Sequence, residues 1–224
     1  MNFRYPIFLD LSGRKCLVTG EGYEVAGKVR GLVDAGAEVC YVNPTAAPEI
    51  EQLAAAGLIQ WQARAFLAGD LEGCFLVIAD CEDNAAIFRL AEERKVLCNA
   101  VDDPEHCRFS FGSIHRQGEL TIAISSNGWA PALAVRIRQL MEREIGPEYG
   151  AFLEILKRLR PIISSGIADF GARRDLWYCI VDSNALQLLR AGERAAAEAM
   201  IQEMVDDAFN STSRSDISGG DGHH

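Results

Sequence analysis

The segment that most constrains the fold of this chain runs from residue 15 to residue 37. A short apolar run at residues 16–18 leads into Gly20-Glu21-Gly22, and a helix-like stretch with regularly spaced apolar residues follows. Glycines let a backbone turn sharply and approach a diphosphate, whose charge then meets the unpaired N–H groups at the helix start. A second apolar run at residues 39–42 completes a strand–helix–strand unit. This order predicts a dinucleotide site, with an ordinary strand-to-helix turn as the alternative.

Two positions depart from the usual dinucleotide pattern. Val25 takes the place of the third glycine, which leaves the close packing of helix on strand open. Asn43 follows the second strand, where an acidic residue normally binds the ribose, and no arginine stands beside it. Because an asparagine can still hydrogen-bond a ribose hydroxyl, the pattern favours NAD over NADP. The expected cofactor contacts are Gly20, Glu21, Gly22, Tyr23, Glu24, Val25, Asn43, Pro44, Ala79 and Asp80.

The remainder of the first half alternates between short apolar runs and helical patterns. We expect strands at residues 58–62, 75–79 and 96–101, and helices at residues 48–56 and 85–94. Such alternation predicts an α/β fold of the Rossmann type, with a mostly parallel sheet that binds its ligands at the carboxyl ends of the strands.

Beyond residue 107 the spacing of apolar residues along the sequence changes. Residues 108–125 alternate as in a β-hairpin, a helix is expected at residues 131–144, and the pattern from residue 149 onward is helical only. These helices carry more apolar surface than a small sheet could cover, which implies a helical subdomain and a partner chain. We therefore expect a cofactor domain at 1–107, a hairpin and helix region for dimerisation at 108–146, a helical domain at 147–209 and a disordered tail at 210–224.

Composition excludes several classes of protein. The formal net charge of −10 over 224 residues argues against a nucleic-acid partner, because phosphate binding needs a basic face. The apolar stretches are too short to span a membrane, and the N-terminus has no basic leader, so a cytoplasmic location is expected. The seven cysteines include no CxxC pair, which indicates small buried side chains instead of disulfides or zinc ligands.

Asp102-Asp103-Pro104 follows the strand expected at residues 96–101. One interpretation is a turn that caps the next helix, a common use of Asp before Pro. The other is a carboxylate beside the nicotinamide that takes up a proton while a hydride leaves, with Asp103 raising the pKa of its neighbour. The residues alone leave both interpretations open.

With these segments in view, the chain resembles the precorrin-2 dehydrogenase family, which also forms the N-terminal part of siroheme synthases. Four segments carry the resemblance: YPIFLDLSGRKCLVTGEG with Lys28 following, LVIADCEDN, CNAVDDPEHCRF and GELTIAISSNGWAPALAVRIRQLME. The resemblance implies NAD-dependent oxidation of precorrin-2 to sirohydrochlorin by a homodimer. It also implies that Gly20 and Gly22 contact the cofactor, that Asp102 is the general base, and that Ser126 matches a serine phosphorylated in some relatives.

Two departures from the family pattern affect the expected site. Asn127 stands where relatives carry a glycine, and Asp80-Cys81 replaces a small residue and a threonine. A carboxylate there would repel a diphosphate, so we expect Asp80 to face solvent or to cap the next helix. A polycarboxylate substrate would need a local basic patch on this acidic protein, to which arginines 136, 138, 173 and 174 could also contribute. The expected substrate contacts are Ser126, Asn127, Arg108, Arg116 and His115.

Two other functions remain open. A bifunctional enzyme would also insert Fe²⁺ or Co²⁺ into sirohydrochlorin, although no metal ligand is assigned in this sequence. A regulatory module that senses a nucleotide would keep the glycine turn, perform no reaction and have no need of Asp102. The sequence also leaves open whether the product feeds siroheme, haem or cobalamin.

Overall fold

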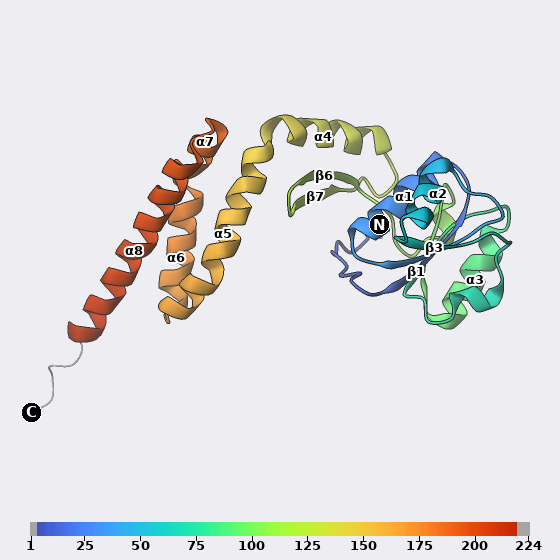
Figure 1. Cartoon of the computed structure of the whole chain (residues 1–224), viewed down its shortest axis with the longest axis horizontal. Helices are drawn as coiled ribbons and strands as arrows, with labels where there is room; N and C mark the ends of the chain where they lie inside the picture. The colour runs from blue at the N-terminus through green and yellow to red at the C-terminus, as the bar shows by residue number, and fades with distance from the viewer. Residues whose placement is uncertain (1–3, 219–224) are drawn as a thin grey trace, which may run out of the picture. The chain divides into compact units, whose positions relative to one another are not determined.

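The computed structural model describes residues 4–218, with side chains through residue 211. It divides into two compact units (Figure 1). The sheet unit contains the chain up to Phe111 together with Asn127–Trp129, and the helical unit contains Gly112–Ser126 and the chain from Ala130 onward. The hairpin thus joins the helices that follow it in a single unit, whereas the sequence analysis placed residues 108–146 apart from them.

The sheet unit is a five-stranded parallel sheet in the order β3-β2-β1-β4-β5. This topology confirms the Rossmann-type α/β fold. Its elements are β1 (Lys15–Gly20), α1 (Tyr23–Asp34), β2 (Glu38–Val42), α2 (Pro48–Ala55), β3 (Ile59–Gln62), η1 (Ala68–Leu71), β4 (Leu76–Asp80), α3 (Asn84–Arg94), β5 (Leu97–Ala100) and η2 (Pro104–His106).

Helices cover both faces of this sheet, because consecutive strand residues point to opposite sides. Val18 of β1 joins Val29 of α1 and Ile50 of α2 in one apolar cluster. The adjacent Leu17 joins Ile87 of α3 in a cluster on the other face. Burial on both faces is why the strands appear in the sequence as unbroken apolar runs instead of alternating ones.

The helical unit begins with an antiparallel hairpin and continues with five helices: β6 (Ser113–Gln117), β7 (Leu120–Ile124), α4 (Pro131–Glu144), α5 (Pro147–Gly166), α6 (Phe170–Val181), α7 (Ala185–Arg190) and α8 (Arg194–Ser218). Its core lies among α5, α6 and α8, where Ile163, Ile180 and Ile201 are fully buried. These apolar residues recur at helical spacing, which is the pattern that predicted a helical subdomain.

Residues 5–11 precede the first strand and form neither a helix nor a strand, and Tyr5 and Phe8 are 86% and 76% exposed. At the other end α8 continues to Ser218, so residues 210–218 are helical instead of disordered, and the rest of the expected tail lies outside the described residues. No helix within residues 4–218 is long and apolar enough to cross a membrane.

Candidate functional site

The candidate site lies at the carboxyl edge of the parallel sheet, where four consecutive strand ends bring polar residues together. Gly20 ends β1 and is paired in register with Asp80, the last residue of β4. Asn43 follows β2 directly, and Asp102 follows β5 by two residues. Parallel strands end at the same edge of a sheet, so residues separated by up to 82 positions in the sequence become neighbours.

The two turn glycines serve different purposes. Gly20 has φ +118°, and a Cβ placed on it would lie 2.6 Å from Cβ of Asp80, so its lack of a side chain is required by the fold itself. Gly22 has φ +108°, but a Cβ placed there would meet only open space. The start of α1 therefore stays clear on its outer side, as a bound diphosphate would require.

Helix α1 also begins without a side-chain cap. Its N-cap residue is Gly22, which has no side chain to accept a hydrogen bond from the first amides of the helix. The first amides of a helix have no partner inside the helix, and they are commonly satisfied by a side chain, by water or by an anionic ligand. An uncapped start next to open space fits a diphosphate group.

Glu21, between the two glycines, turns toward the end of β2. Its Oε1 accepts a hydrogen bond from Nδ2 of Asn43 at 3.0 Å and another from the hydroxyl of Thr45. These bonds, first the one from Thr45 and then the one from Asn43, hold the pKa of the Glu21 carboxyl below its ordinary value. Asn43 is itself buried and lies 2.9 Å from the Thr45 carbonyl through the same nitrogen. The amide nitrogen of Asn43 therefore already donates to atoms of the protein. We had expected this side chain to hydrogen-bond a ribose hydroxyl.

Asp80 neither faces solvent fully nor caps a helix, which corrects the expectation for this residue. Asp83 caps α3 instead, because its Oδ1 accepts a hydrogen bond from the Ala86 amide at 2.9 Å. Asp80 is half-buried, and its pKa is raised above the ordinary value, first by burial and then by the charges of Asp102 and Glu24. The carboxylates of Asp102, after β5, and Glu24, in the first turn of α1, are therefore close enough to Asp80 for their charges to act on it.

Asp102 stands exposed at this edge. Its backbone has φ +54°, in the left-handed region that Asp and Asn adopt more readily than most residues. Asp103 makes a separate contact, because its Oδ2 lies 2.7 Å from Nδ1 of His106. The carboxylate that interacts electrostatically with Asp102 is thus Asp80, from the neighbouring strand.

The remaining expected cofactor contacts fall into two groups. Val25 and Ala79 are fully buried core residues, so only their backbone atoms could meet a ligand. Val25 packs in the cluster between α1 and the sheet, so the missing third glycine does not prevent close packing. Tyr23, Glu24 and Pro44 are exposed around the glycine turn and the end of β2.

Two of the expected substrate contacts have other roles. His115 is only 5% exposed, and its Nε2 donates to the Ile145 carbonyl at 2.8 Å, so its ring joins the hairpin to the end of α4 and does not face a ligand. Arg108 donates from Nε to Oε1 of Glu92 at 2.8 Å and lies over the Phe88 ring. Both side chains are engaged within their own units.

Arg116 lies on β6, and Ser126 and Asn127 lie in the loop that follows β7. Arg116 is exposed on β6, and the half-buried Ser126 accepts a hydrogen bond from the Ala130 amide through Oγ at 3.2 Å. Asn127 has φ +53°. Asparagine tolerates this left-handed conformation better than other residues, so it can hold the loop in a shape that a glycine would also adopt.

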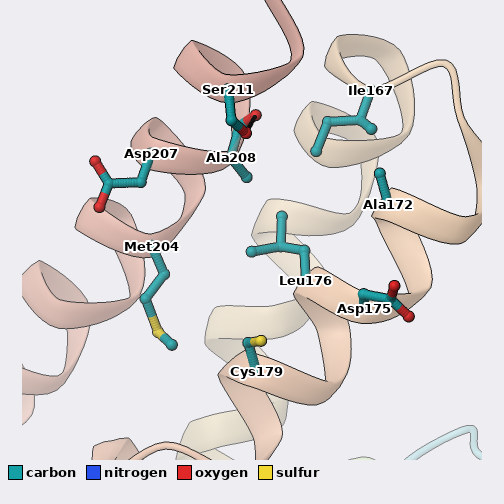
Figure 2. Close-up of a pocket in the computed structure, with 9 residues that line it drawn as sticks. All are labelled: Ile167, Ala172, Asp175, Leu176, Cys179, Met204, Asp207, Ala208 and Ser211. Carbon is teal, nitrogen blue, oxygen red and sulfur yellow. Dashed lines mark hydrogen bonds between the residues drawn. The ribbon is translucent and has the colours of Figure 1, made fainter. Parts of the chain in front are cut away.

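Cavities occur in the helical unit. One of about 500 Å³ opens between α6 and α8 (Figure 2), where Leu176 and Met204 lie in the gap and the carboxylates of Asp175 and Asp207 point away from each other. A larger one, of about 920 Å³, includes Arg173, whose guanidinium donates to the carbonyls of residues 167 and 168. The larger cavity is also lined by Lys157 and Glu119, which pair with each other in an ion pair. Within residues 4–218 no group of three His, Cys, Asp or Glu side chains could hold a metal ion.

Three family models match consecutive parts of the chain. An NAD(P)-binding model matches residues 7–113, a model of the central region of a sirohaem biosynthesis protein matches residues 117–144, and a model of the sirohaem synthase dimerisation region matches residues 148–205. The three matches follow the order of the elements described above, from the parallel sheet through the hairpin and α4 to the helices.

Curated relatives are similar along most of the chain. Siroheme synthase 1 of Serratia proteamaculans is 37% identical over 204 residues, and siroheme synthase 1 of Yersinia enterocolitica is 39% identical over 200 residues. These alignments cover 90% and 88% of this chain but 43% and 42% of the relatives, so the chain spans less than half of their length.

A solved structure shares the fold. SirC, a precorrin-2 dehydrogenase, superposes with a TM-score of 0.73, and the match covers 89% of this chain and 99% of that one. The sequence identity is 23%, so this likeness concerns the fold.

Thr45 was not among the residues expected at the site. This residue donates to Glu21 and, through its carbonyl, accepts from Tyr41 at 3.2 Å. No sequence pattern marks it, because its role depends on the turn after β2 bringing it back to the glycine turn.

Proposed function

We propose that this chain, which belongs to the family of precorrin-2 dehydrogenases and siroheme synthases, oxidises precorrin-2 to sirohydrochlorin with NAD and acts as a homodimer. The observation that carries the proposal is the placement of an exposed carboxylate, Asp102, on the same sheet edge as an uncapped glycine turn. The three consecutive family models and the names of the relatives support the substrate class.

The residues of the turn fit a nicotinamide dinucleotide. Gly22 and the first amides of α1 would hold the diphosphate, and the β4 and β5 ends would lie along the nicotinamide half, as in other doubly wound sheets. When bound, the nicotinamide supplies the hydride acceptor for the oxidation. The chain's own contribution is to orient the two reactants and to take up the proton that leaves the macrocycle.

Asp102 is the group that we assign to proton uptake. Its side chain is exposed in the turn that follows β5, where its backbone adopts the left-handed conformation, so it is accessible to a ligand outside the sheet. Asp80 lies close enough to Asp102 for the charge of Asp102 to raise the pKa of the Asp80 carboxyl, after the larger effect of burial. Asp102 is the exposed member of this pair and the one that a substrate could meet.

The test is turnover of precorrin-2 by the full chain with NAD, followed by the absorbance of sirohydrochlorin. Asp102→Asn keeps the size of the side chain and suits the same backbone conformation, and it should lower kcat by about 100-fold or more, the usual contribution of a general base. Glu105→Gln is the matched control, because it removes one exposed acidic charge from the nearby η2.

Two results would contradict the proposal. Equal turnover by Asp102→Asn and the parent chain would remove the assigned base. Binding of NAD without any turnover by the parent would favour a nucleotide sensor.

A further inference from the structure

A carboxylate from another segment, the glycine turn, lies at the end of β2. In dinucleotide-binding sheets, an Asp or Glu at this strand end accepts hydrogen bonds from the adenosine ribose. Here the strand ends at Val42 and is followed by Asn43, an amide. The carboxylate of Glu21, from the glycine turn, reaches this position and lies 3.0 Å from the Asn43 nitrogen.

We propose that Glu21 is the acceptor for the ribose hydroxyls of the cofactor and that it thereby selects NAD over NADP. The inference rests on the proposed function, because it assumes a nicotinamide dinucleotide on the glycine turn. It assigns Asn43 and Thr45 as positioning residues that hold Glu21 and do not themselves bind the ribose.

The hydrogen bonds support this assignment. Both bonds that Glu21 receives go to Oε1, and the residue is exposed, so its carboxylate still faces the side from which a ligand would approach. The same bonds keep the carboxyl ionised well below neutral pH, because they favour the charged form. An ionised carboxylate is the stronger acceptor for a hydroxyl donor.

The orientation of Glu21 also resolves a conflict of charge. A carboxylate within a diphosphate-binding turn would repel the ligand if it pointed toward the start of α1. Asn43 and Thr45 draw it to the ribose position instead, where the hydroxyl donors of NAD make it favourable. The same charge would oppose the 2′-phosphate of NADP, which adds negative charge to the ribose that Glu21 faces.

The arginine that follows the neighbouring strand β3 is already engaged. Arg64 follows β3 and binds Asp70 through two hydrogen bonds, at 2.6 Å and 2.8 Å. Paired in this fork-like manner, it offers little positive charge to a 2′-phosphate. The charges around the end of β2 therefore point to the same selectivity.

The experiment compares dissociation constants of the full chain for NADH and NADPH, measured by the fluorescence of the reduced nicotinamide, so that it does not depend on turnover. The parent should bind NADH more tightly. Glu21→Gln should weaken NADH binding by about tenfold or more, because it removes a charge-assisted hydrogen bond, and should weaken NADPH binding less or improve it. Thr45→Val should shift the ratio in the same direction by a smaller factor.

Glu49→Gln serves as the control, since it removes an exposed charge from the first turn of α2 without touching this network, and it should leave the ratio unchanged. An unchanged ratio in Glu21→Gln would overturn the inference while leaving the dehydrogenase proposal intact. A parent that binds NADH selectively but does not oxidise precorrin-2 would support the role of Glu21 and contradict the dehydrogenase. A parent that binds neither dinucleotide would overturn both.

Discussion

The hydroxyl of Tyr41 donates a hydrogen bond to the Gly20 carbonyl at 2.6 Å. This bond joins the carboxyl-terminal part of β2 to the glycine turn at the end of β1, and the tyrosine that makes it is fully buried. The conformation of the glycine turn is thus stabilised by Tyr41, a core residue of the sheet. The candidate site therefore depends on a buried side chain that could not itself contact a ligand.

Replacing Tyr41 with Phe should therefore affect both stability and binding. The variant removes the hydroxyl and leaves the Gly20 carbonyl without this donor, which should lower the free energy of unfolding by about 1 kcal/mol. Urea denaturation would measure the loss, and NADH titration should show weaker binding. Tyr178→Phe, which alters an exposed tyrosine in the helical unit, is the control.

Tyr41 should also make the protein sensitive to high pH. Burial is the main cause that raises its pKa from 10 to about 12. A group whose pKa is raised on folding contributes stability that is full below the unfolded value and is lost as pH rises through the folded value. Unfolding free energy should fall between pH 10 and pH 12 by at most about 1.4 kcal/mol per pH unit from this residue, and less steeply in Tyr41→Phe. Equal slopes for the two proteins would contradict the assignment.

Asp80→Asn should stabilise the protein at neutral pH. The raised pKa of this carboxyl means that its contribution to stability is present below the ordinary pKa and lost as pH rises through the folded value. At pH 7 its charge is therefore unfavourable, and removing it should add about 0.5 kcal/mol to the free energy of unfolding. The gain should disappear near pH 3, where the carboxyl is protonated in both states. Glu82→Gln, an exposed neighbour, should show neither effect.

The buried thiols should be inert in the folded protein. Burial raises the pKa of Cys16 to about 11 and that of Cys98 to about 12, so the reactive thiolate is scarce at pH 8. Iodoacetamide should modify the exposed Cys179 first, and the other two only after unfolding in urea. Peptide mapping by mass spectrometry would check the order, and labelling of Cys98 as fast as Cys179 would contradict it.

The proposed dimer should depend on the exposed apolar side chains of α6. Tyr178 and Val181 are 64% and 50% exposed, within the region matched by the dimerisation model. Replacing both with Glu should shift the protein from dimer to monomer in light scattering. Leu67→Glu, which alters a 59% exposed residue of the sheet unit, should leave the mass unchanged. A dimer that survives the double substitution would place the interface elsewhere.

The sequence predicted the parts of this fold that depend on periodicity. The parallel strands and the helix of residues 131–144 follow from runs of apolar residues, and the glycine turn follows from the two glycines between a strand and a helix. It did not predict which polar side chains meet. The bonds from Asn43 and Thr45 to Glu21 span 22 and 24 residues, and no local pattern records them.

The contacts of individual site residues were unpredictable for the same reason. Histidine and arginine occur both in ligand sites and in structural contacts, so the contacts of His115 and Arg108 could be identified only once their partners were known. The carbonyl of Ile145 lies 30 residues from His115, and Glu92 lies 16 residues from Arg108. Asp103 pairs with His106, which is only three residues away. A contact this local could have been predicted from the sequence.

The tight approach of Gly20 to Asp80 limits how this protein could evolve. Even alanine at position 20 would have to push β1 and β4 apart while adopting a backbone angle that side chains disfavour. In a saturation library selected only for folding, with no cofactor supplied, position 20 should still return glycine, while position 22, beside open space, should accept substitutions more often. A glycine that is invariant at position 20 among related proteins would therefore reflect the close packing of β1 against β4. It would not by itself show that those proteins still bind a ligand.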